Sequence, residues 1–413
     1  MNLMSADTAG STPGDESPGT AHPGTVREVF AAFLKLGLTS FGGPVAHLGY
    51  FREAFVERRR WLSDAAYADL VALCQFLPGP ASSQVGMALG LQRAGIGGLI
   101  AAWFAFTMPS AIILIAFAFG VASFGDAAGT GWLQGLKAAA VAVVAQAVLG
   151  MAKTLTPDAR RATIAAAGAV VVLLVPSPAV QVAVIAAGAL VGLAWLRPGP
   201  VDDGGGLGIR VSRRVGAGAL ALFAALLIGL PIAAAATGDA ALRLADTFYR
   251  AGALVFGGGH VVLPLLEAET VPNGLVAHDT FLAGYGAAQA VPGPLFTFAG
   301  YLGASTTTGP AGLLGAAIAL LAIFLPAALL AVGALPFWDR LRRATSARSA
   351  LMGVNAAVVG ILAAALYDPV FTQGVTSTGS LAVAIAVFVA QRAWNVPAWA
   401  AVIAAGVVGY FVL

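Results

Sequence analysis

Two short motifs of glycine and proline each occur twice in this 413-residue chain. The first copy reads FGGP at 41–44 and PGP at 78–80. The second copy reads FGGG at 256–259 and PGP at 292–294. All four motifs lie inside apolar segments, where glycine and proline break a helix. A helix that begins again after such a break presents unpaired N–H groups and a partial positive charge, so these motifs predict anion binding.

Polar side chains at matched positions of the two copies extend this prediction. A basic residue precedes the first motif in each copy, Lys35 and Arg250, and a glutamine precedes the second motif, Gln75 and Gln289. A charge at membrane depth is costly, so it usually faces a cavity or a substrate path. Two converging cations would suit a dianion with four oxygens. The alternative is that both cations extend to the membrane interface, because each lies near the start of its segment.

We therefore expect a substrate site made of the motif residues and the polar residues beside them. Its expected members are Lys35, Ser40, Phe41, Gly42, Gly43, Gln75, Pro78, Gly79, Pro80 and Ser82 in the first copy, and Arg250, Phe256, Gly257, Gly258, Gln289, Pro292, Gly293 and Pro294 in the second. The alternative is that glycine and proline only allow kinks and close helix packing.

Two histidines, His47 and His260, follow the FGG run of each copy. They are candidates for proton coupling, because imidazole changes its charge near neutral pH. The alternative for each histidine is a packing role inside the helix bundle.

The combination of FGGP and PGP in one half with FGGG and PGP in the other resembles the chromate ion transporter family in its long, two-domain form. The resemblance covers residues 26–413. It implies a secondary transporter that exports chromate across the bacterial inner membrane and confers chromate resistance. The implied partners are chromate, with sulfate or another oxyanion as the alternative, and the lipid bilayer. A membrane scaffold without transport is the alternative of another class.

Composition indicates that the chain lies in a membrane. Hydrophobic residues make up 59% of it and charged residues only 10%, whereas a soluble domain carries roughly 25% charged residues. The apolar runs are long and do not alternate as barrel strands do. The sequence therefore predicts an all-α polytopic membrane protein.

The motifs divide the chain into two repeats and their connections. Residues 1–24 are expected to be a disordered cytoplasmic leader, and 26–196 the first repeat. Residues 197–241 are expected to form a basic linker with one extra transmembrane helix, and 242–413 the second repeat. Each repeat is predicted to contain two broken elements followed by four ordinary helices.

Loop charges predict opposite orientations for the two repeats. In the first repeat Lys and Arg lie between and after the broken elements, whereas 120–130 and 176–178 contain none. In the second repeat the loops near 265–280, 303–310 and 368–377 contain none. The positive-inside rule then predicts inverted repeats with re-entrant broken elements, nine full crossings, a cytoplasmic N-terminus and an external C-terminus. A model with thirteen crossings, in which the broken elements span fully, is the alternative.

The remaining ionisable residues and the absence of enzyme motifs further narrow the class of protein that the sequence predicts. Lys137 is expected to extend to the interface, and Glu267, Glu269 and Asp279 to be solvated in an external loop. The sequence contains no HExxH, GxSxG or P-loop lysine motif, and its single cysteine, Cys74, makes no disulfide or metal site by itself. We therefore expect no enzyme activity, no cofactor, no metal and no nucleic-acid partner, and we leave a homodimer open.

Overall fold

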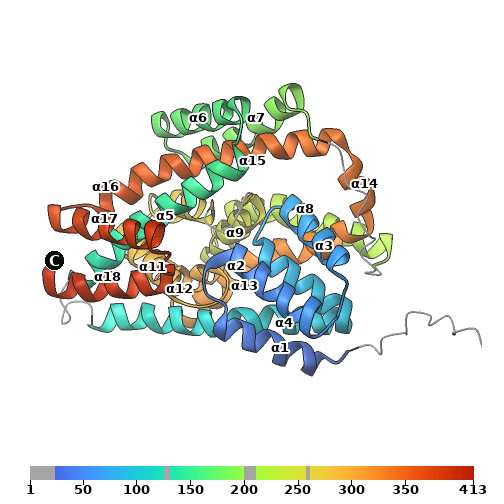
Figure 1. Ribbon diagram of the computed structural model, residues 1–413, viewed down its shortest axis with the longest axis horizontal. Coiled ribbons are helices and arrows are strands. Elements are labelled where there is room, and N and C mark those ends of the chain that lie inside the picture. The colour runs from blue at the N-terminus through green and yellow to red at the C-terminus, as the bar shows by residue number, and fades with distance from the viewer. Residues whose placement is uncertain (1–23, 125–130, 200–210, 257–260) are drawn as a thin grey trace, which may run out of the picture.

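The computed structural model describes residues 24–124, 131–199, 211–256 and 261–413, and every regular element in these ranges is a helix (Figure 1). Six of the described helices are long and apolar enough to cross a membrane. These observations confirm the predicted all-α polytopic membrane protein. Residues 1–23 of the predicted leader and most of the predicted linker loop lie outside the described residues.

The helices follow the predicted order in each half. The first half consists of α1 (Val26–Thr39), α2 (Gly43–Phe51), the π-helix η1 (Arg52–Arg58), α3 (Asp64–Phe76), α4 (Ala81–Phe124), α5 (Gly131–Leu155), α6 (Ala159–Leu174) and α7 (Pro178–Trp195). The extra helix α8 (Arg213–Thr237) connects the halves. The second half consists of α9 (Ala240–Leu254), α10 (Val262–Thr270), α11 (His278–Ala290), η3 (Leu295–Thr297), α12 (Phe298–Ala304), α13 (Gly312–Ala334), η4 (Leu335–Phe337), α14 (Trp338–Arg343), α15 (Thr345–Ala365), η5 (Leu366–Phe371), α16 (Thr372–Gly374), α17 (Thr378–Ala393) and α18 (Ala398–Val412).

The helices on either side of the FGG motifs are too short to cross a bilayer. In the first half α1 has 14 residues and α2 has 9; in the second half α9 has 15 and α10 has 9. A crossing helix needs about 20 residues at a rise of about 1.5 Å per residue. The matched helices α1 and α9 also begin alike, because the side chains of Thr25 and Asp239 accept hydrogen bonds from the N–H groups of Glu28 and Leu242.

The helix α4 is a hairpin of two arms. Ala94 and Gly95 leave the helical conformation between the arms. The arms then pack closely, since a Cβ added to Gly90 would lie 2.3 Å from the carbonyl oxygen of Gly98. The second half builds the same hairpin from α12 and α13, where a Cβ on Gly303 would lie 2.3 Å from the carbonyl oxygen of Gly315.

Glycine also determines how the first helix of each half packs. A Cβ on Gly37 of α1 would lie 2.7 Å from the carbonyl oxygen of Ala105 in α4. A Cβ on Gly252 of α9 would lie 2.2 Å from the carbonyl oxygen of Ile323 in α13. Close packing therefore accounts for these two matched glycines, as small residues at membrane helix interfaces commonly do.

The last helices of each half pack against the other half. In α7, Gly188 approaches Gly353 of α15, and in α5, Gly135 approaches Ala405 of α18. In Figure 1, α6 and α7 lie beside α15, and α17 and α18 lie beside α5. The final helix pair of each half thus packs against a helix of the other half. Reciprocal contacts of this kind are typical of a two-fold relation between the halves.

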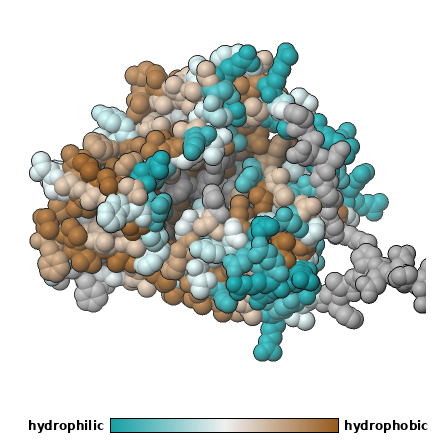
Figure 2. Space-filling model, in the orientation of Figure 1, coloured by the Kyte–Doolittle hydropathy of each residue, from teal (hydrophilic) through white to brown (hydrophobic). Residues whose placement is uncertain are grey.

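Apolar side chains cover much of the outer surface. The helix α8 buries only Gly216 and Ala234 and exposes large residues such as Ile228 and Ile232. Figure 2 shows hydrophobic residues over α17 and α18 at the left of this view, and hydrophilic residues gathered toward the right. Apolar exposure on this scale marks a surface that contacts lipid.

We predict that Gly252→Leu destabilises the protein, because any Cβ at this position meets the backbone of α13. Overpacking of this kind costs about 1–3 kcal/mol. Thermal unfolding of the detergent-solubilised chain measures the effect. The control is Gly229→Leu on α8, where nothing lies within 4 Å of an added Cβ. Equal unfolding temperatures for the two variants would contradict the close packing of α9 on α13.

Candidate functional site

Backbone hydrogen bonds join each PGP motif to the broken element of the other half. The N–H of Gly79 donates to the carbonyl of Val255 at 2.7 Å, and the N–H of Gly293 donates to the carbonyl of Ser40 at 2.9 Å. Both glycines have positive φ, 116° and 97°, a conformation that glycine adopts without steric cost. The duplicated motifs therefore meet in crossed pairs at the interface between the halves.

These crossed bonds satisfy carbonyl groups that the helix breaks would leave unpaired. Ser40 is the C-cap of α1, and Val255 is the C-cap of α9. The last carbonyls of a helix have no partner within it. In hydrocarbon such a group costs several kcal/mol, so a broken helix needs a partner from elsewhere in the protein. Each half supplies this partner to the other.

A cavity of about 240 Å³ lies at one of these crossings. Its lining draws on both halves of the chain: Gly42, Gly43 and Gln146 from the first, and Gln289, Gly293 and Gln391 from the second. The cavity therefore combines the FGG motif of one repeat with the PGP motif of the other. Sites between paired repeats with broken helices are where membrane transporters bind substrates.

The donors at this cavity are neutral. Gly42 is the N-cap of α2, and no side chain caps this helix, so its first N–H groups remain available at the break. The Nε2 group of Gln391 is buried and has no hydrogen-bond partner among the described residues. No Asp, Glu, Lys or Arg occurs among the described residues that line the cavity. Such an arrangement can hold an oxyanion through N–H groups and the helix dipole while leaving it free to dissociate.

His47 lies next to the cavity, and both nitrogens of its ring have a polar partner. The ring is buried, with Nε2 3.1 Å from the carbonyl oxygen of Ser40 and Nδ1 3.4 Å from Oγ of Ser82. A neutral imidazole meets both contacts, because one nitrogen donates to the carbonyl while the other accepts from the hydroxyl. This environment favours a packing role for His47. His260, Gly257 and Gly258 lie outside the described residues.

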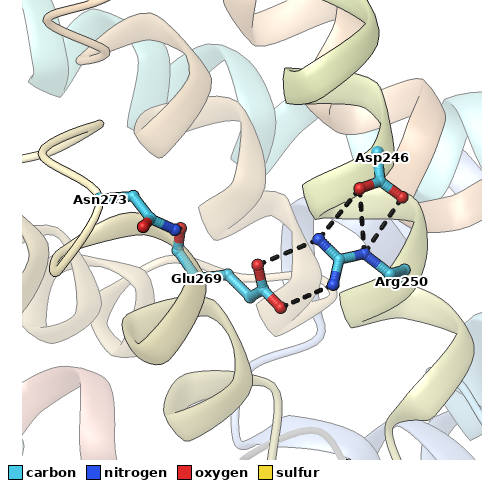
Figure 3. A network of polar contacts seen from close by, with 4 residues as sticks. All are labelled: Asp246, Arg250, Glu269 and Asn273. Carbon is cyan, nitrogen blue, oxygen red and sulfur yellow. Dashed lines mark hydrogen bonds and ion pairs between the residues drawn. The ribbon is translucent and has the colours of Figure 1, made fainter. Parts of the chain in front are cut away.

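Arg250 is bound by carboxylates on two helices (Figure 3). Its Nε lies 3.1 Å from both oxygens of Asp246, one turn earlier in α9. Its two terminal nitrogens lie 2.9 and 3.1 Å from the two carboxylate oxygens of Glu269 in α10. The guanidinium thus joins α9 to α10 across the second FGG motif. The expectation that Glu269 is solvated is wrong, since its side chain is only 15% exposed and pairs with Arg250.

The other two cations have different surroundings. Lys35 is exposed on α1 and makes no ion pair with a described residue. Lys137 is buried, and its ammonium lies 2.7 Å from Oδ1 of Asp279, whose side chain is exposed. The expectation that Lys137 extends to the interface is wrong, because its side chain is only 9% exposed and ends in this ion pair. The structure does not present Arg250 as a free cation that Lys35 could join at a dianion.

The remaining predicted residues fall into two groups. Those with a packing or backbone contact include Phe41, whose ring lies 5.4 Å from that of Trp399, and Pro78, whose carbonyl accepts a hydrogen bond from Gln84. Pro292 and Pro294 are buried, Phe256 is half-buried, and Pro80 directly precedes α4. Gln75, in contrast, is exposed, so the matched glutamines Gln75 and Gln289 have different environments.

The sequence analysis did not identify Gln146, Gln391 or Asp246. Each glutamine directly follows an apolar run, 138–145 in α5 and 381–390 in α17, and a polar residue at such a position is a signal in the sequence for a side chain that faces the bundle interior. Asp246 lies four residues before Arg250, at the spacing that allows an ion pair on one helix face.

Comparison with known proteins shows which family this chain matches. The family model described as "Chromate transporter" matches residues 27–193 and 242–410. The chromate transport protein of Pseudomonas aeruginosa is 29% identical over 407 residues, covering 94% of this chain and 93% of that protein. The chromate transport protein of Cupriavidus metallidurans is 29% identical over 359 residues, covering 84% and 83%. No solved structure gives a significant match.

We predict that Arg250→Ala lowers the unfolding temperature, because it leaves Asp246 and Glu269 without their cation. Breaking a buried ion pair costs about 3–5 kcal/mol, and the effect here should be smaller since the Arg250 side chain is 33% exposed. Thermal unfolding in detergent measures it. The matched control, Lys35→Ala, should leave the unfolding temperature unchanged. Two equal decreases would contradict the different roles that the structure gives these cations.

Proposed function

Because this chain belongs to the chromate transporter family, we propose that it exports chromate across the bacterial inner membrane and so confers chromate resistance. The observation that supports this most strongly is the cavity at the crossing of the two repeats, whose described lining offers N–H donors and no carboxylate. Chromate is a tetrahedral dianion, and a carboxylate in such a cavity would repel it. We place the substrate between Gly42, Gly43 and Gln391.

The neutral character of the donors limits selectivity. Backbone N–H groups and glutamine amides bind any tetrahedral oxyanion of similar size. Sulfate is therefore expected to compete with chromate for the same cavity. Exchange of sulfate or another oxyanion stays the alternative within transport, since the geometry of the donors does not distinguish the two anions.

Reciprocal packing of the halves supports an alternating-access cycle. Transporters with inverted repeats move one repeat or bundle against the other around a fixed central site. In this chain the crossed bonds from Gly79 to Val255 and from Gly293 to Ser40 would connect the halves at the site. Opposite loop charges support the inverted orientation that such a cycle requires.

We assign the matched cations to roles outside the cavity. Arg250 holds α9 and α10 together on either side of the second FGG motif. Lys35 is exposed, so it can attract a dianion from solution by long-range electrostatics without holding it.

We predict that Gln391→Leu lowers the initial rate of chromate flux in vesicles about tenfold or more. A hydrogen bond to a charged group contributes about 1.5–3 kcal/mol, and 1.4 kcal/mol corresponds to a factor of ten. The control is Gln92→Leu, at the half-buried turn between the arms of α4.

Cells that express the wild-type chain should also tolerate more chromate and accumulate less chromium. Unchanged tolerance and chromium content would contradict export, and normal flux from Gln391→Leu would contradict this site.

We also predict the orientation of the chain. Single cysteines introduced into a Cys74→Ser background should react with an impermeant thiol reagent from outside at positions 305 and 372. A cysteine at position 345 should react only after the membrane is opened. Reaction at 345 from outside, without reaction at 305 and 372, would overturn the inverted arrangement.

A further inference from the structure

A second cavity, of about 400 Å³, lies away from the proposed chromate site. It is enclosed by the turn between α6 and α7, by α10 and the start of α11, and by the end of α15 with η5. Glu267, His278, Asp368 and Gln181 line it, and no Lys or Arg occurs among its described lining residues. Neither the chromate site nor the crossed backbone bonds involve these residues.

Two buried polar atoms at this cavity, one on His278 and one on Gln181, have no hydrogen-bond partner among the described residues. The carboxylate of Glu267 is 17% exposed and lies 3.9 Å from Nδ1 of His278, which is too far for a hydrogen bond. Nε2 of His278 has no partner among the described residues. Gln181 is 6% exposed, and its Oε1 is likewise unpartnered, while its Nε2 lies 3.4 Å from the carbonyl oxygen of Pro264.

Unpaired buried polar atoms are costly and call for an explanation. The unpartnered atoms at this cavity are Nε2 of His278 and Oε1 of Gln181, and the carboxylate of Glu267, also an acceptor, lies beside them. The second carboxylate, on the exposed Asp368, accepts a hydrogen bond from Oγ1 of Thr372 at 3.0 Å. A proton bound to Glu267 would convert one acceptor into a donor beside the others. It would also remove the repulsion between the carboxylates of Glu267 and Asp368.

The first repeat has a different pair at the equivalent positions. The register that matches Phe41 with Phe256 matches Arg52 with Glu267, and Asp64 and His278 are the first residues of α3 and α11. Nε of Arg52 lies 2.7 Å from Oδ1 of Asp64. In the first repeat an ion pair therefore joins these two positions. In the second repeat the carboxylate of Glu267 and the imidazole of His278 line a cavity and make no hydrogen bond with each other. Packing alone would not require this difference.

The charged groups around Glu267 leave it without a compensating cation. On its own helix, Glu269 pairs with Arg250 of α9, which also pairs with Asp246. From α11, Asp279 pairs with Lys137 of α5. From η5, Asp368 adds a second negative charge, and the turn between α6 and α7 contributes Ser177 and Gln181 but no charged residue to the lining. Both neighbouring cations are therefore occupied by other carboxylates.

This environment sets the pH at which Glu267 takes up a proton. The helix α10 is too short to cross the bilayer, and burial together with Asp368 raises the pKa of Glu267 to about 7. Burial also lowers the pKa of His278, an effect that Lys137 reinforces and that Asp279 and Asp368 oppose. As the pH falls through about 7, Glu267 thus gains a proton while His278 stays available as an acceptor.

We propose that Glu267 and His278 form a proton-binding site through which proton entry drives anion export. The coupling part of this inference depends on the proposed export function. The loops that meet at the cavity, near 176–178, 265–280 and 368–377, contain no Lys or Arg, and loop charge assigns them to the outside. The proton comes from external water and binds the carboxylate of Glu267. The same helix, α10, carries Glu269 and its bond to Arg250, so protonation acts on the element that follows the second FGG motif.

The first experiment tests proton binding without any transport. Infrared spectra of the purified full chain should show a protonated carboxyl band that grows as the pH falls from about 9 to about 5, with a midpoint near neutral pH. The variant Glu267→Gln should lose this component. The control Glu57→Gln, an exposed carboxylate paired with Arg52, should keep it. A neutral-range band that persists in Glu267→Gln would overturn the site.

The second experiment tests coupling in proteoliposomes. For one proton per chromate, each unit of pH gradient can change the chromate ratio across the membrane by about tenfold. Wild-type flux should respond to this gradient, and Glu267→Gln should abolish the response while the Glu57→Gln protein keeps it. A gradient response unchanged in Glu267→Gln, or flux that follows sodium and not protons, would overturn the proposal. Absence of chromate flux in a wild-type chain that still shows the infrared titration would instead contradict the export function.

Discussion

The unpaired carbonyl at the end of a broken helix is the constraint on which this structure depends. A membrane gives such a group no water, so the protein must provide a donor. In this chain the donors are the N–H groups of Gly79 and Gly293, and each reaches the half to which it does not belong. This exchange explains why the breaks occur as matched pairs. Separation of the halves would remove the Gly79 donor from Val255 and the Gly293 donor from Ser40, which would keep only its contact with His47. The same exchange brings an FGG motif and a PGP motif to one cavity.

The two cavities differ in charge, so the anion and the proton would bind in different surroundings. The described lining of the smaller cavity has no ionisable residue, whereas that of the larger one has two carboxylates and a histidine. A carboxylate at the first cavity would oppose a dianion, and a cation at the second would oppose proton uptake. The nearby cations, Lys137 and Arg250, are each held by carboxylates. Helix α10 bears Glu267 at the larger cavity and follows Val255, whose carbonyl accepts from Gly79 at the other crossing of the two repeats.

Signals that are local in the sequence predicted most of the fold. Apolar length, helix breakers and the duplicated motifs predicted the all-α membrane class and the two repeated halves. The reciprocal packing, in which α6 and α7 contact α15 while α17 and α18 contact α5, was not predicted. It depends on glycine contacts between residues far apart in the chain, such as Gly188 and Gly353. The matched position of Lys35 and Arg250 suggested one shared role. Their surroundings differ because Asp246 and Glu269 have no counterpart beside Lys35. The spacing of Asp246 from Arg250 is visible in the sequence, whereas the pairing of Glu269 with Arg250 between two helices leaves no periodic signal.

The central proposal is that the crossing of the two repeats forms the anion site. Diffraction from crystals of the full chain grown with chromate, measured at the chromium absorption edge, would locate the substrate directly. We expect an anomalous peak in the cavity beside Gly43 and Gln391, within hydrogen-bond distance of their N–H groups. A chromium peak at the guanidinium of Arg250, with Glu269 displaced, or at Lys35 with the cavity empty, would contradict it.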